Sequence, residues 1–541
     1  MPESIPRRLR SACAAMAAQF IDVSRRRGIA AAAVALARRV LGVGRLRRRR
    51  ALAALSAPRS ALMVSVQITP AHCSSEAVVA TSSSLFAQAH PHWRLLARPN
   101  ARDAGPGRLE PLGDLVAIVA AGDVLHPEAL AWLAHAAACD PRADVVYTDE
   151  ERERVEGGAP QPYRKPDWSP ELLLSEPYAL HCVAIRRELY LRLGGLGPEA
   201  DEAAQYAFVL RATAAARRVG HVRRVLCRRP AESGLDPEAG LRVVAEVAQS
   251  LDPPARAAPG ARRGTFRLVR RPNERPCVTL VVITSDPVSR VDGRGEVRIL
   301  ANFLTSVVAR STYPDYRLLV VDDGDISQES LAIMRESRAR RVTYPDSQSR
   351  GTSFNFSRKV NFALSQVDTD YFVLLNDDLE VIAPDWIEAL MDYAVIPGVG
   401  AVGAHLLFAD GRTQHAGVVA AGADGPAHRF YGHPPRAADE RGSAEVVCDY
   451  SAVTAAVLAS RCELALGVGA FDEAFALHYN DVDFCLRLRR RGYRIVFTPF
   501  SRLYHFEHTS VRLSHPAPSE LKLFRQRWGA WCDDDPLFPR L

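Results

Sequence analysis

The sequence lacks the cysteine patterns that mark disulfide-rich and zinc-binding proteins. Its ten cysteines stand singly, with no C-x-x-C pair and no Cys/His group at zinc-ligand spacing. This excludes a disulfide framework and a structural zinc site, and it suits a reducing cytosol. The stretch Ile29 to Val43 is also shorter than the roughly 20 apolar residues that span a bilayer, and Arg38 and Arg39 interrupt it. It lacks the order of a secretory signal as well.

Basic residues are concentrated at the N-terminus. Residues 1–50 carry thirteen arginines against Glu3 and Asp22, so the net charge of +7 leaves the rest of the chain at −4. Residues 1–57 therefore suit either an amphipathic helix on an anionic membrane surface or a solvated basic arm. Nucleic acid is not an expected partner, because no aromatic residues are interleaved with the arginines. We expect a cytoplasmic protein, peripheral on the inner membrane if the arm binds lipid.

Length and composition predict two large globular domains. The chain has 541 residues, of which 48% are hydrophobic and 24% charged. Apolar runs at 62–68, 115–119 and 145–148, with a helical pattern at 127–137, predict an α/β domain over residues 58–229. Residues 230–276, rich in Pro, Gly, Ala and Arg, are the predicted linker. The second domain is predicted over 277–512, followed by a tail, 513–541.

Two strands of the second domain end in acidic clusters. The buried-strand pattern of 278–284 is followed by strands at 317–321 and 371–375, which run into Asp322–Asp325 and Asn376–Asp378. Ligands of open α/β sheets sit beyond the carboxyl ends of the strands, so both clusters would face one site. Clustered carboxylates need a cation, and hard oxygen ligands suit Mg²⁺ or Mn²⁺ holding a diphosphate. Taken alone, either cluster is more simply a polar turn.

A third polar group lies further along the chain. Asn480–Asp483 precedes an amphipathic helical pattern, where carboxylates are explained equally by helix capping. A turn and a strand then lead to 504–508, which contains His505 and Glu507. Acids at a helix start together with this histidine could supply metal ligands or a general base.

Residues 277–512 resemble family 2 glycosyltransferases of the GT-A fold, especially the bacterial rhamnosyltransferase-like enzymes of O-antigen and related polysaccharide synthesis. The resemblance is carried in order by VTLVVITSD, LLVVDDGD, FNFSRKVNFA, VLLNDDLEVIAPDWIEAL, DGRTQHAGVV, SAVTAAVLAS, GAFDEAFALHYNDVDFCLRLRRRGYRIVFTP and LYHFEH. It implies tandem GT-A-like, Rossmann-like domains and an inverting, metal-dependent hexosyl- or rhamnosyltransferase. The implied partners are a nucleotide-diphosphate sugar and a lipid-linked or cell-surface glycan acceptor.

The resemblance also implies a role for each site residue. Donor binding falls to Thr284, Asp286, Asp322, Asp323, Asn355, Asn361, Asn376 and Asp377. Asp378 and His505 would hold the Mg²⁺ or Mn²⁺, and Asp481 would be the catalytic base with Asp483 beside it. Asn376 and Asn480 depart from the family pattern, because each stands where an acid is usual.

The first domain resembles the same family without its acids. VVYTDEE, YRKPDWSPELLLSEPYALH and YAFVLRATAAARRVGHVRRVL carry this likeness. The expected acidic loop reads Ala120–Asp123 with one carboxylate, and the expected acidic helix start reads Gln205–Ala207. We therefore predict a degenerate copy serving as scaffold, acceptor groove or partner surface. A live, metal-independent second transferase would have to use the acids Asp149, Glu150, Asp167 or Asp201.

Two further readings remain open at this stage. Both domains could be degenerate and bind or scaffold glycan, although retention of Asp378, Asp481 and His505 argues against this. A nucleotidyltransferase would share acids at strand ends but should show a phosphate loop after its first strand. Asp292–Gly295 is the only weak candidate for such a loop.

Overall fold

The computed structural model describes most of the chain after the basic arm. The described residues are 57–69, 75–96, 111–154, 157–197, 200–231, 234–270, 276–291, 295–345, 354–421, 425–506, 518–535 and 537–538. Apart from Ala57, the predicted arm lies outside them. The described chain forms two compact units, with unit 1 taking residues up to 173, 177–247 and 440–442, and unit 2 taking 174–176, 248–439 and 443 onward.

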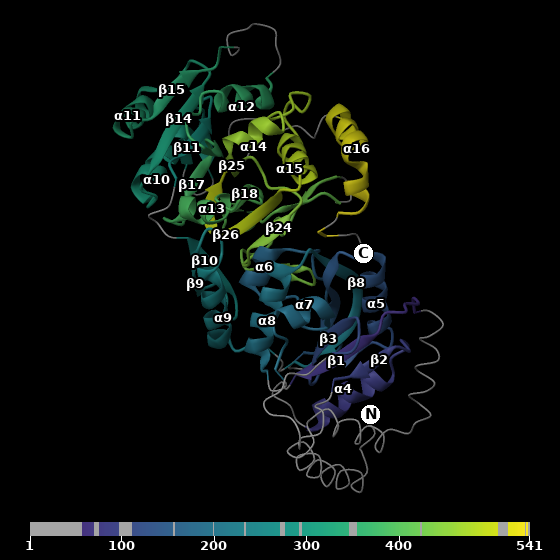
Figure 1. The fold of residues 1–541 in the computed structure, drawn as a ribbon. Coiled ribbons are helices and arrows are strands. Elements are labelled where there is room, and N and C mark those ends of the chain that lie inside the picture. The colour runs from purple at the N-terminus through teal and green to yellow at the C-terminus, as the bar shows by residue number, and fades with distance from the viewer. Residues whose placement is uncertain are drawn as a thin grey trace. The chain divides into compact units, whose positions relative to one another are not determined.

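Unit 1 is built from alternating strands and helices, as the first apolar series predicted. Its elements are β1 (Val64–Thr69), α4 (Ser75–Phe86), β2 (Trp93–Leu95), β3 (Leu115–Ala120), β4 (Val124–Leu125), α5 (Ala129–Cys139), β5 (Ala143–Arg152), β6 (Gln161–Tyr163), α6 (Pro170–Ser175), β7 (Val183–Arg186), α7 (Arg187–Arg192), α8 (Glu202–Ala215), β8 (Arg218–Arg229) and α9 (Pro237–Gln249). The order of its sheet is β2-β1-β3-β7-β5-β8-β4. Figure 1 labels most of these elements.

Unit 2 contains a larger sheet and more helices. Its elements are β9 (Ala255–Pro259), β10 (Phe266–Arg270), β11 (Val278–Ile283), β12 (Val288–Val291), β13 (Gly295–Arg298), α10 (Ile299–Arg310), β14 (Tyr316–Asp322), α11 (Gln328–Glu336), β15 (Arg340–Thr343), α12 (Phe356–Leu364), β16 (Tyr371–Asn376), β17 (Leu379–Val381), α13 (Trp386–Ala394), β18 (Val399–Leu407), β19 (Thr413–His415), β20 (Val418–Val419), β21 (Ala427–His428), β22 (Ala438–Asp439), β23 (Gly442–Ser443), β24 (Cys448–Tyr450), β25 (Val457–Arg461), α14 (Cys462–Gly467), α15 (Asn480–Arg490), β26 (Arg494–His505) and α16 (Pro518–Asp533). Its main sheet has the order β15-β14-β11-β16-β25-β18-β26-β17.

Helices cover both faces of the unit 2 sheet. Side chains alternate along a strand, so Leu280 and Val282 of β11 pack on one face while Val281 and Ile283 pack on the other. The first face is covered by α10, α11 and α13, and the second by α12, α14, α15 and α16 (Figure 1). This double cover explains why β11 reads as a continuous apolar run, with every residue buried.

The two sheets have the same topology. Leaving out β15, each strand in the main order of the unit 2 sheet has a counterpart in unit 1 at the same place in the order. The parallel or antiparallel relation also agrees at every step. The predicted fold class, α/β with two tandem domains whose central sheets are mostly parallel, is confirmed.

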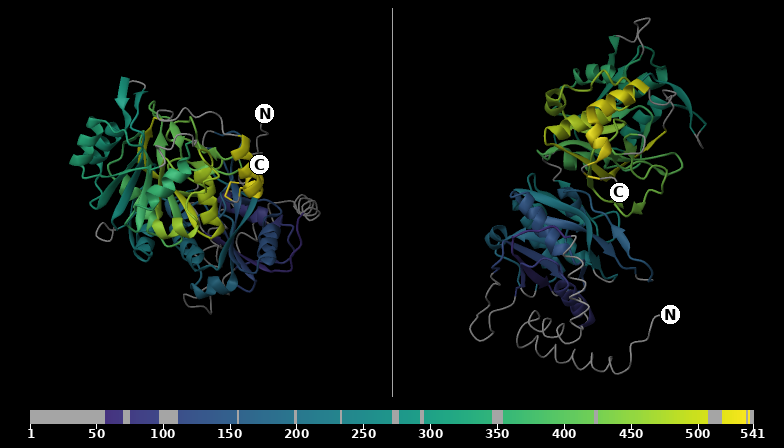
Figure 2. Two further views of the ribbon diagram at one scale, coloured as in Figure 1. Left: turned by 90° about the horizontal axis from the view of Figure 1, so that it is seen from above. Right: turned by 90° about the vertical axis from the view of Figure 1, so that its right-hand side faces the viewer.

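The segments predicted as linker and tail both contain regular structure. The unit boundary at residue 247 falls inside the predicted linker, which holds α9 and the β9–β10 hairpin. The Arg270 amide of the hairpin donates to Asp392 of α13 over 2.9 Å. The predicted tail contains α16, which buries Phe524 and Trp528 against the layer of α15. Both views of Figure 2 show α16, in yellow, at the outside of unit 2.

Candidate active site

A pocket of about 480 Å³ opens in unit 2 where β11 and β16 end. The parallel pairing of these strands sets Ile283 opposite Asn376, so the residues that follow each strand meet at one edge of the sheet. Of the twelve site residues predicted from the sequence, seven line this pocket. They are Thr284, Asp323, Asn376, Asp377, Asp378, Asp481 and His505.

The loop between β16 and β17 is held by contacts on both sides. Asp377 accepts a 2.6 Å hydrogen bond from the Thr284 hydroxyl. Asp378 Oδ1 lies 3.0 Å from His505 Nε2, and both side chains are at most 10% exposed. The backbone causes this proximity, because β17 pairs with β26 and the Phe506 amide donates to the Asp378 carbonyl over 2.9 Å.

The Asp378 and His505 pair fits a divalent cation by its donor chemistry and spacing. Carboxylate oxygen suits both Mn²⁺ and Mg²⁺, whereas imidazole nitrogen suits a transition ion such as Mn²⁺ better than Mg²⁺. Two adjacent ligands at ~2.1 Å from an octahedral ion lie about 3 Å apart, which matches the observed separation. Among the described residues, no group of three or more His, Cys, Asp or Glu side chains is gathered for a metal. The protein would thus supply two such ligands, with the Asn376 amide alongside at 3.2 Å from His505 Nε2.

Asp481 reaches the pocket from the first turn of α15. Its carboxylate accepts hydrogen bonds from the Ala455 amide at 3.0 Å and from the Val482 amide at 2.8 Å. The side chain stays partly exposed at the start of the helix. A partly exposed carboxylate that borders a pocket can accept a proton from a bound hydroxyl.

A buried lysine that the sequence analysis did not single out also lines the pocket. Lys359 of α12 is 1% exposed, and its ammonium donates to the Thr284 carbonyl and to Asp323, each over 2.8 Å. Burial lowers the pKa of Lys359, and the Asp323 carboxylate opposes that shift. A cation so placed can bind an anionic ligand. Its signal was present in the string FNFSRKVNFA, but spacing alone does not show which side chain turns inward.

Asp286 and Asp322, both predicted to bind donor, do not line the pocket. Asp322 is fully buried and takes two hydrogen bonds from Arg341, at 2.7 and 3.0 Å. Burial alone would raise the pKa of Asp322, but these bonds and one from Gly324 lower it instead. Asp286 accepts from the Ser327 amide and the Ser330 hydroxyl, each at 2.8 Å. Both carboxylates therefore shape the loops behind the pocket.

Asn355 and Asn361 likewise lie outside the pocket lining. Asn355 caps α12 through the Arg358 amide and donates to the Glu473 carbonyl. Asn361 makes a paired contact with Phe471, donating to its carbonyl at 2.8 Å and accepting from its amide at 2.9 Å. The two amides fasten α12 to the segment that leads into α15.

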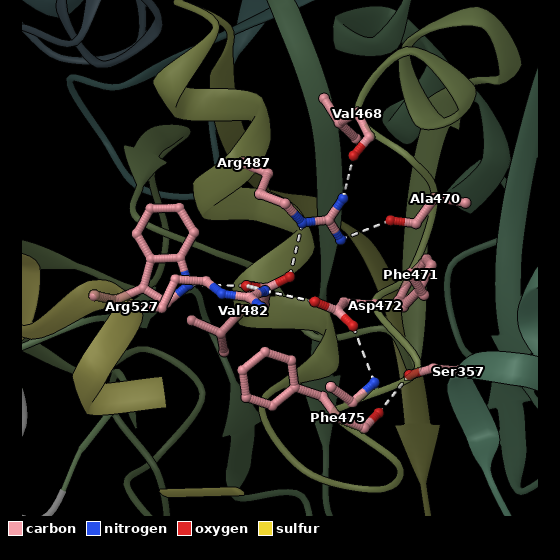
Figure 3. A network of polar contacts seen from close by, with 12 residues as sticks. Ser357, Val468, Ala470, Phe471, Asp472, Phe475, Val482, Arg487 and Arg527 are labelled. Carbon is pink, nitrogen blue, oxygen red and sulfur yellow. Dashed lines mark hydrogen bonds and ion pairs between the residues drawn. The ribbon is translucent and has the colours of Figure 1, made fainter. Parts of the chain in front are cut away.

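Asp483 is a correction to the predicted catalytic pair. Its carboxylate is fully buried and accepts from Arg487 Nε at 2.7 Å, Arg527 Nη1 at 2.8 Å and Trp528 Nε1 at 2.9 Å. Figure 3 shows Arg487 and Arg527 in this network, with Arg527 also reaching Asp472. Because the carboxylate is enclosed between α15 and α16, it has no access to the pocket.

Twelve other residues, to which the sequence analysis gave no role in the site, line the pocket. They are Ile283, Ser285, Phe354, Phe356, Gln414, His428, Tyr431, Thr454, Ala455, Ala456, Leu477 and Asn480. Gln414 belongs to the string DGRTQHAGVV and accepts from His505 Nδ1 at 2.6 Å. Tyr431 is 52% exposed at the pocket and has its ring 5.2 Å from Phe408.

The corresponding place in unit 1 holds different chemistry. The loop between β3 and β4 carries Asp123, which pairs with His181 at 2.9 Å, both about 1% exposed. Gln205 of α8, the helix that corresponds to α15, accepts from the Thr69 hydroxyl at 2.8 Å and donates to the Leu180 carbonyl at 2.7 Å. In unit 1, neutral hydrogen bonds of Gln205 thus join the segments whose counterparts border the pocket in unit 2.

The four acids on which a live unit 1 would depend are all engaged. Asp149 accepts from the Lys165 amide and contacts His221, each at 2.9 Å. The fully buried Glu150 pairs with Lys165 at 2.8 Å and with Arg229 at 3.0 Å. Asp167 contacts His221 and Arg223, both at 2.8 Å, and Asp201 caps α8 through the Ala204 amide.

A comparison with known families matches one segment of unit 2. Residues 294–431 match the model of glycosyl transferase family 2. This segment is a family 2 glycosyltransferase domain. The resemblance predicted from the sequence motifs is thereby confirmed, and the matched segment of the family 2 domain includes Asp378, Lys359 and Gln414.

Relatives extend the likeness to both units. O-antigen biosynthesis protein RfbC of Myxococcus xanthus is 32% identical over 427 residues, covering 76% of this chain and 32% of that protein. The uncharacterized protein y4gI of Sinorhizobium fredii is 31% identical over 453 residues, which cover 79% of this chain and 48% of the length of y4gI. The chain thus spans about a third to a half of the length of these relatives.

Two solved structures show a weaker likeness. GalNAc-T7 with UDP, GalNAc and Mn²⁺ has a TM-score of 0.36 and 11% identity, covering 56% of this chain and 58% of its own. Mannosyltransferase PcManGT from Pyrobaculum calidifontis, with GDP-Man and Mn²⁺, has a TM-score of 0.30 and 14% identity, covering 48% and 70%. TM-scores of this size support no inference about donor or metal in this chain. Separately, no helix within the described residues has the length and hydropathy needed to cross a membrane.

Proposed function

We propose that unit 2 is an inverting glycosyltransferase that moves a hexosyl or rhamnosyl group from a nucleotide-diphosphate sugar to a glycan acceptor. The observation that supports this most directly is that Asp378, His505 and Asp481 border one pocket. A metal-holding pair and a general base must face the same bound donor and acceptor for transfer to occur. Three segments far apart in sequence bring these side chains to the pocket, which supports the proposal.

Each residue has a distinct part in the proposed reaction. Asp378 and His505 would hold a divalent cation, with Asn376 beside them; such a cation, when bound, offsets the charge of the leaving diphosphate. Lys359 adds a positive charge to the pocket, where its ammonium is held by Asp323 and the Thr284 carbonyl. Asp481 takes the proton from the acceptor hydroxyl. The hydroxyl oxygen attacks the anomeric carbon of the donor sugar on the face opposite the leaving nucleoside diphosphate. One displacement of this kind inverts the anomeric configuration.

The acceptor class is proposed from the relatives. The Myxococcus relative is named an O-antigen biosynthesis protein, and the acceptor proposed here is therefore a lipid-linked or cell-surface polysaccharide. A cytoplasmic position follows for an enzyme that uses cytosolic nucleotide sugars, with peripheral membrane contact through the basic arm. Unit 1 is proposed to be a degenerate copy, because its acids are engaged in buried pairs.

The test is donor binding by the purified chain. A panel of UDP, GDP and dTDP sugars is titrated with Mn²⁺ or Mg²⁺, and donor hydrolysis or transfer is followed in parallel. We expect binding that requires the metal and that is abolished by Asp378→Ala. Binding and turnover that persist in EDTA would refute the metal role. A chain that binds no donor under any condition would support the non-catalytic scaffold alternative.

A further inference from the structure

Gln414 has one satisfied and one unsatisfied polar atom beside the donor pocket. It lies in β19 and is 3% exposed, and its side chain borders the pocket. Its Oε1 accepts from His505 Nδ1 at 2.6 Å. Its Nε2 is buried without a hydrogen-bond partner in the described structure. Burial of an amide N–H₂ without a partner is unfavourable, so such an atom points to a ligand.

The short contact fixes which atom of Gln414 faces the histidine. A separation of 2.6 Å suits a strong N–H···O bond but is too short for an amide nitrogen against an imidazole nitrogen. Gln414 Oε1 can only accept, so His505 Nδ1 carries hydrogen. In the neutral imidazole, His505 Nε2 then carries the lone pair, and it lies 3.0 Å from Asp378 Oδ1 and 3.2 Å from the Asn376 amide nitrogen. This neutral form is the one that can share a cation with Asp378.

Strand geometry explains why Gln414 alone of its strand faces the pocket. Side chains alternate along β19, so the neighbours of Gln414 point the other way. The Thr413 hydroxyl contacts His405 at 3.2 Å, and His415 contacts His428 at 3.0 Å. Gln414 thus lies behind His505, and a hydrogen-bonded partner in that place commonly fixes the tautomer of a metal-binding histidine.

We propose that Gln414 positions His505 for the cation and also binds the donor. Its Oε1 holds the His505 tautomer whose Nε2 lone pair faces Asp378, and its Nε2 donates a hydrogen bond to a diphosphate oxygen of the nucleotide. This rests on the proposed function of unit 2 and adds a residue with two separable roles. The ligand class recognised by the free amide is a nucleoside diphosphate.

Two substitutions separate the roles in the full-length protein. Gln414→Glu keeps an acceptor for His505 Nδ1–H but replaces the N–H₂ with a charge that repels phosphate. Gln414→Met removes both functions at similar volume. Gln328→Glu is the matched control, because Gln328 is exposed on α11 and does not border the pocket. Thermal unfolding without metal checks that each variant is folded.

The readouts are Mn²⁺ affinity, measured by electron paramagnetic resonance without nucleotide, and the affinity for UDP, GDP or dTDP at saturating Mn²⁺. We expect Gln414→Glu to bind Mn²⁺ as tightly as the wild type or more so, and its nucleotide about 10-fold or more weakly. Gln414→Met should bind Mn²⁺ about 10–100-fold more weakly, and the nucleotide weakly too.

Each other outcome overturns a stated part of the proposal. Wild-type Mn²⁺ affinity in Gln414→Met would remove the positioning role, and wild-type nucleotide affinity in Gln414→Glu would remove the donor contact. A wild-type chain that binds neither Mn²⁺ nor any of the three nucleotides would overturn the proposed function itself. That result differs from a failure of the Gln414 proposal alone, because the wild-type protein itself would then lack binding.

Discussion

At the scale of single residues, Asp481 and Asp483 differ in what surrounds them although both lie in the first turn of α15. Successive residues of an α-helix are about 100° apart, so two residues separated by one position point about 200° apart. Asp481 faces the pocket, and Asp483 faces Arg527 and Trp528. Helical geometry therefore allows only one of the two to serve as base.

Asp481→Asn should separate donor binding from transfer. The amide keeps the shape of the side chain but accepts no proton, so kcat should fall by about 100-fold or more. Nucleotide affinity should stay within about threefold of the wild type, because the Asp378 and His505 pair is unchanged. Calorimetric titration and a transfer assay measure the two quantities. A variant with wild-type kcat would exclude Asp481 as the base.

His405 should make unit 2 sensitive to mild acid. Burial, with a smaller contribution from Arg502, lowers the pKa of His405 to about 4, whereas an unfolded histidine titrates near 6.5. Between these values the unfolded chain binds the extra proton, so the free energy of unfolding falls as the pH drops from about 6.5 to about 4. The full difference is about 3 kcal/mol.

His405→Gln should remove the contribution of His405 to this pH dependence and leave that of the buried His415, whose pKa burial also lowers. The measurement is urea unfolding at pH 7 and pH 5, compared between the variant and the wild type. His433→Gln, at an exposed position of the same unit, is the control and should keep the wild-type dependence. An unchanged slope in His405→Gln would show that other groups cause the acid sensitivity.

At the scale of elements, the contact between α15 and α16 is centred on one buried carboxylate. Asp483 accepts from donors on both helices, and Phe524 and Trp528 pack on the same layer. The sequence after residue 512 carries apolar residues at helical spacing, which explains why the predicted tail is a packed helix. The pocket-forming start of α15 is thus supported from behind by α16.

Asp483→Asn should lower stability more than it changes chemistry. Removing the charge takes the Asp483 counter-ion from Arg487 and leaves Arg527 with Asp472 alone, at a cost of roughly 2–4 kcal/mol. The melting temperature should drop while nucleotide affinity stays near the wild-type value. Asp533→Asn, on the exposed end of α16, should change neither. Lost turnover at an unchanged melting temperature would restore a catalytic role to Asp483.

At the scale of the whole molecule, two sheets of the same order apart from β15 differ in what their strand ends carry. Unit 2 brings together acids, a lysine and a histidine around a pocket, whereas unit 1 joins the equivalent segments through Gln205, Thr69 and the Leu180 carbonyl. Shared topology therefore does not give shared chemistry.

One nucleotide should bind per chain. Calorimetric titration of the wild type with Mn²⁺ and its nucleotide should give a stoichiometry of about one, and Asp378→Ala should reduce it to zero. If unit 1 were a live, metal-independent transferase, the wild type would bind two nucleotides and Asp378→Ala would still bind one. Asp201→Ala tests the same alternative by removing one of the acids that a live unit 1 could use. We expect this variant to bind one nucleotide, as the wild type does.

Motif order and periodicity were sufficient to predict much of this protein. The apolar runs predicted the parallel strands β11, β14 and β16 and the residues that follow them, because strand ends are local features of sequence. The loop after β16, with Asp378, follows directly from that pattern. The helical repeat likewise placed Asp481 at the start of α15.

The sequence by itself determined the α/β order of each unit and the resemblance to family 2, since both depend on local periodicity and short motifs. Only the tertiary structure decided which acids face the pocket, because that depends on partners from distant segments. Asp322 turns to Arg341 and Asp483 to Arg527, while Gln414 meets His505 across 91 positions of the chain. Side-chain direction is set by packing between segments, which no single stretch of residues encodes.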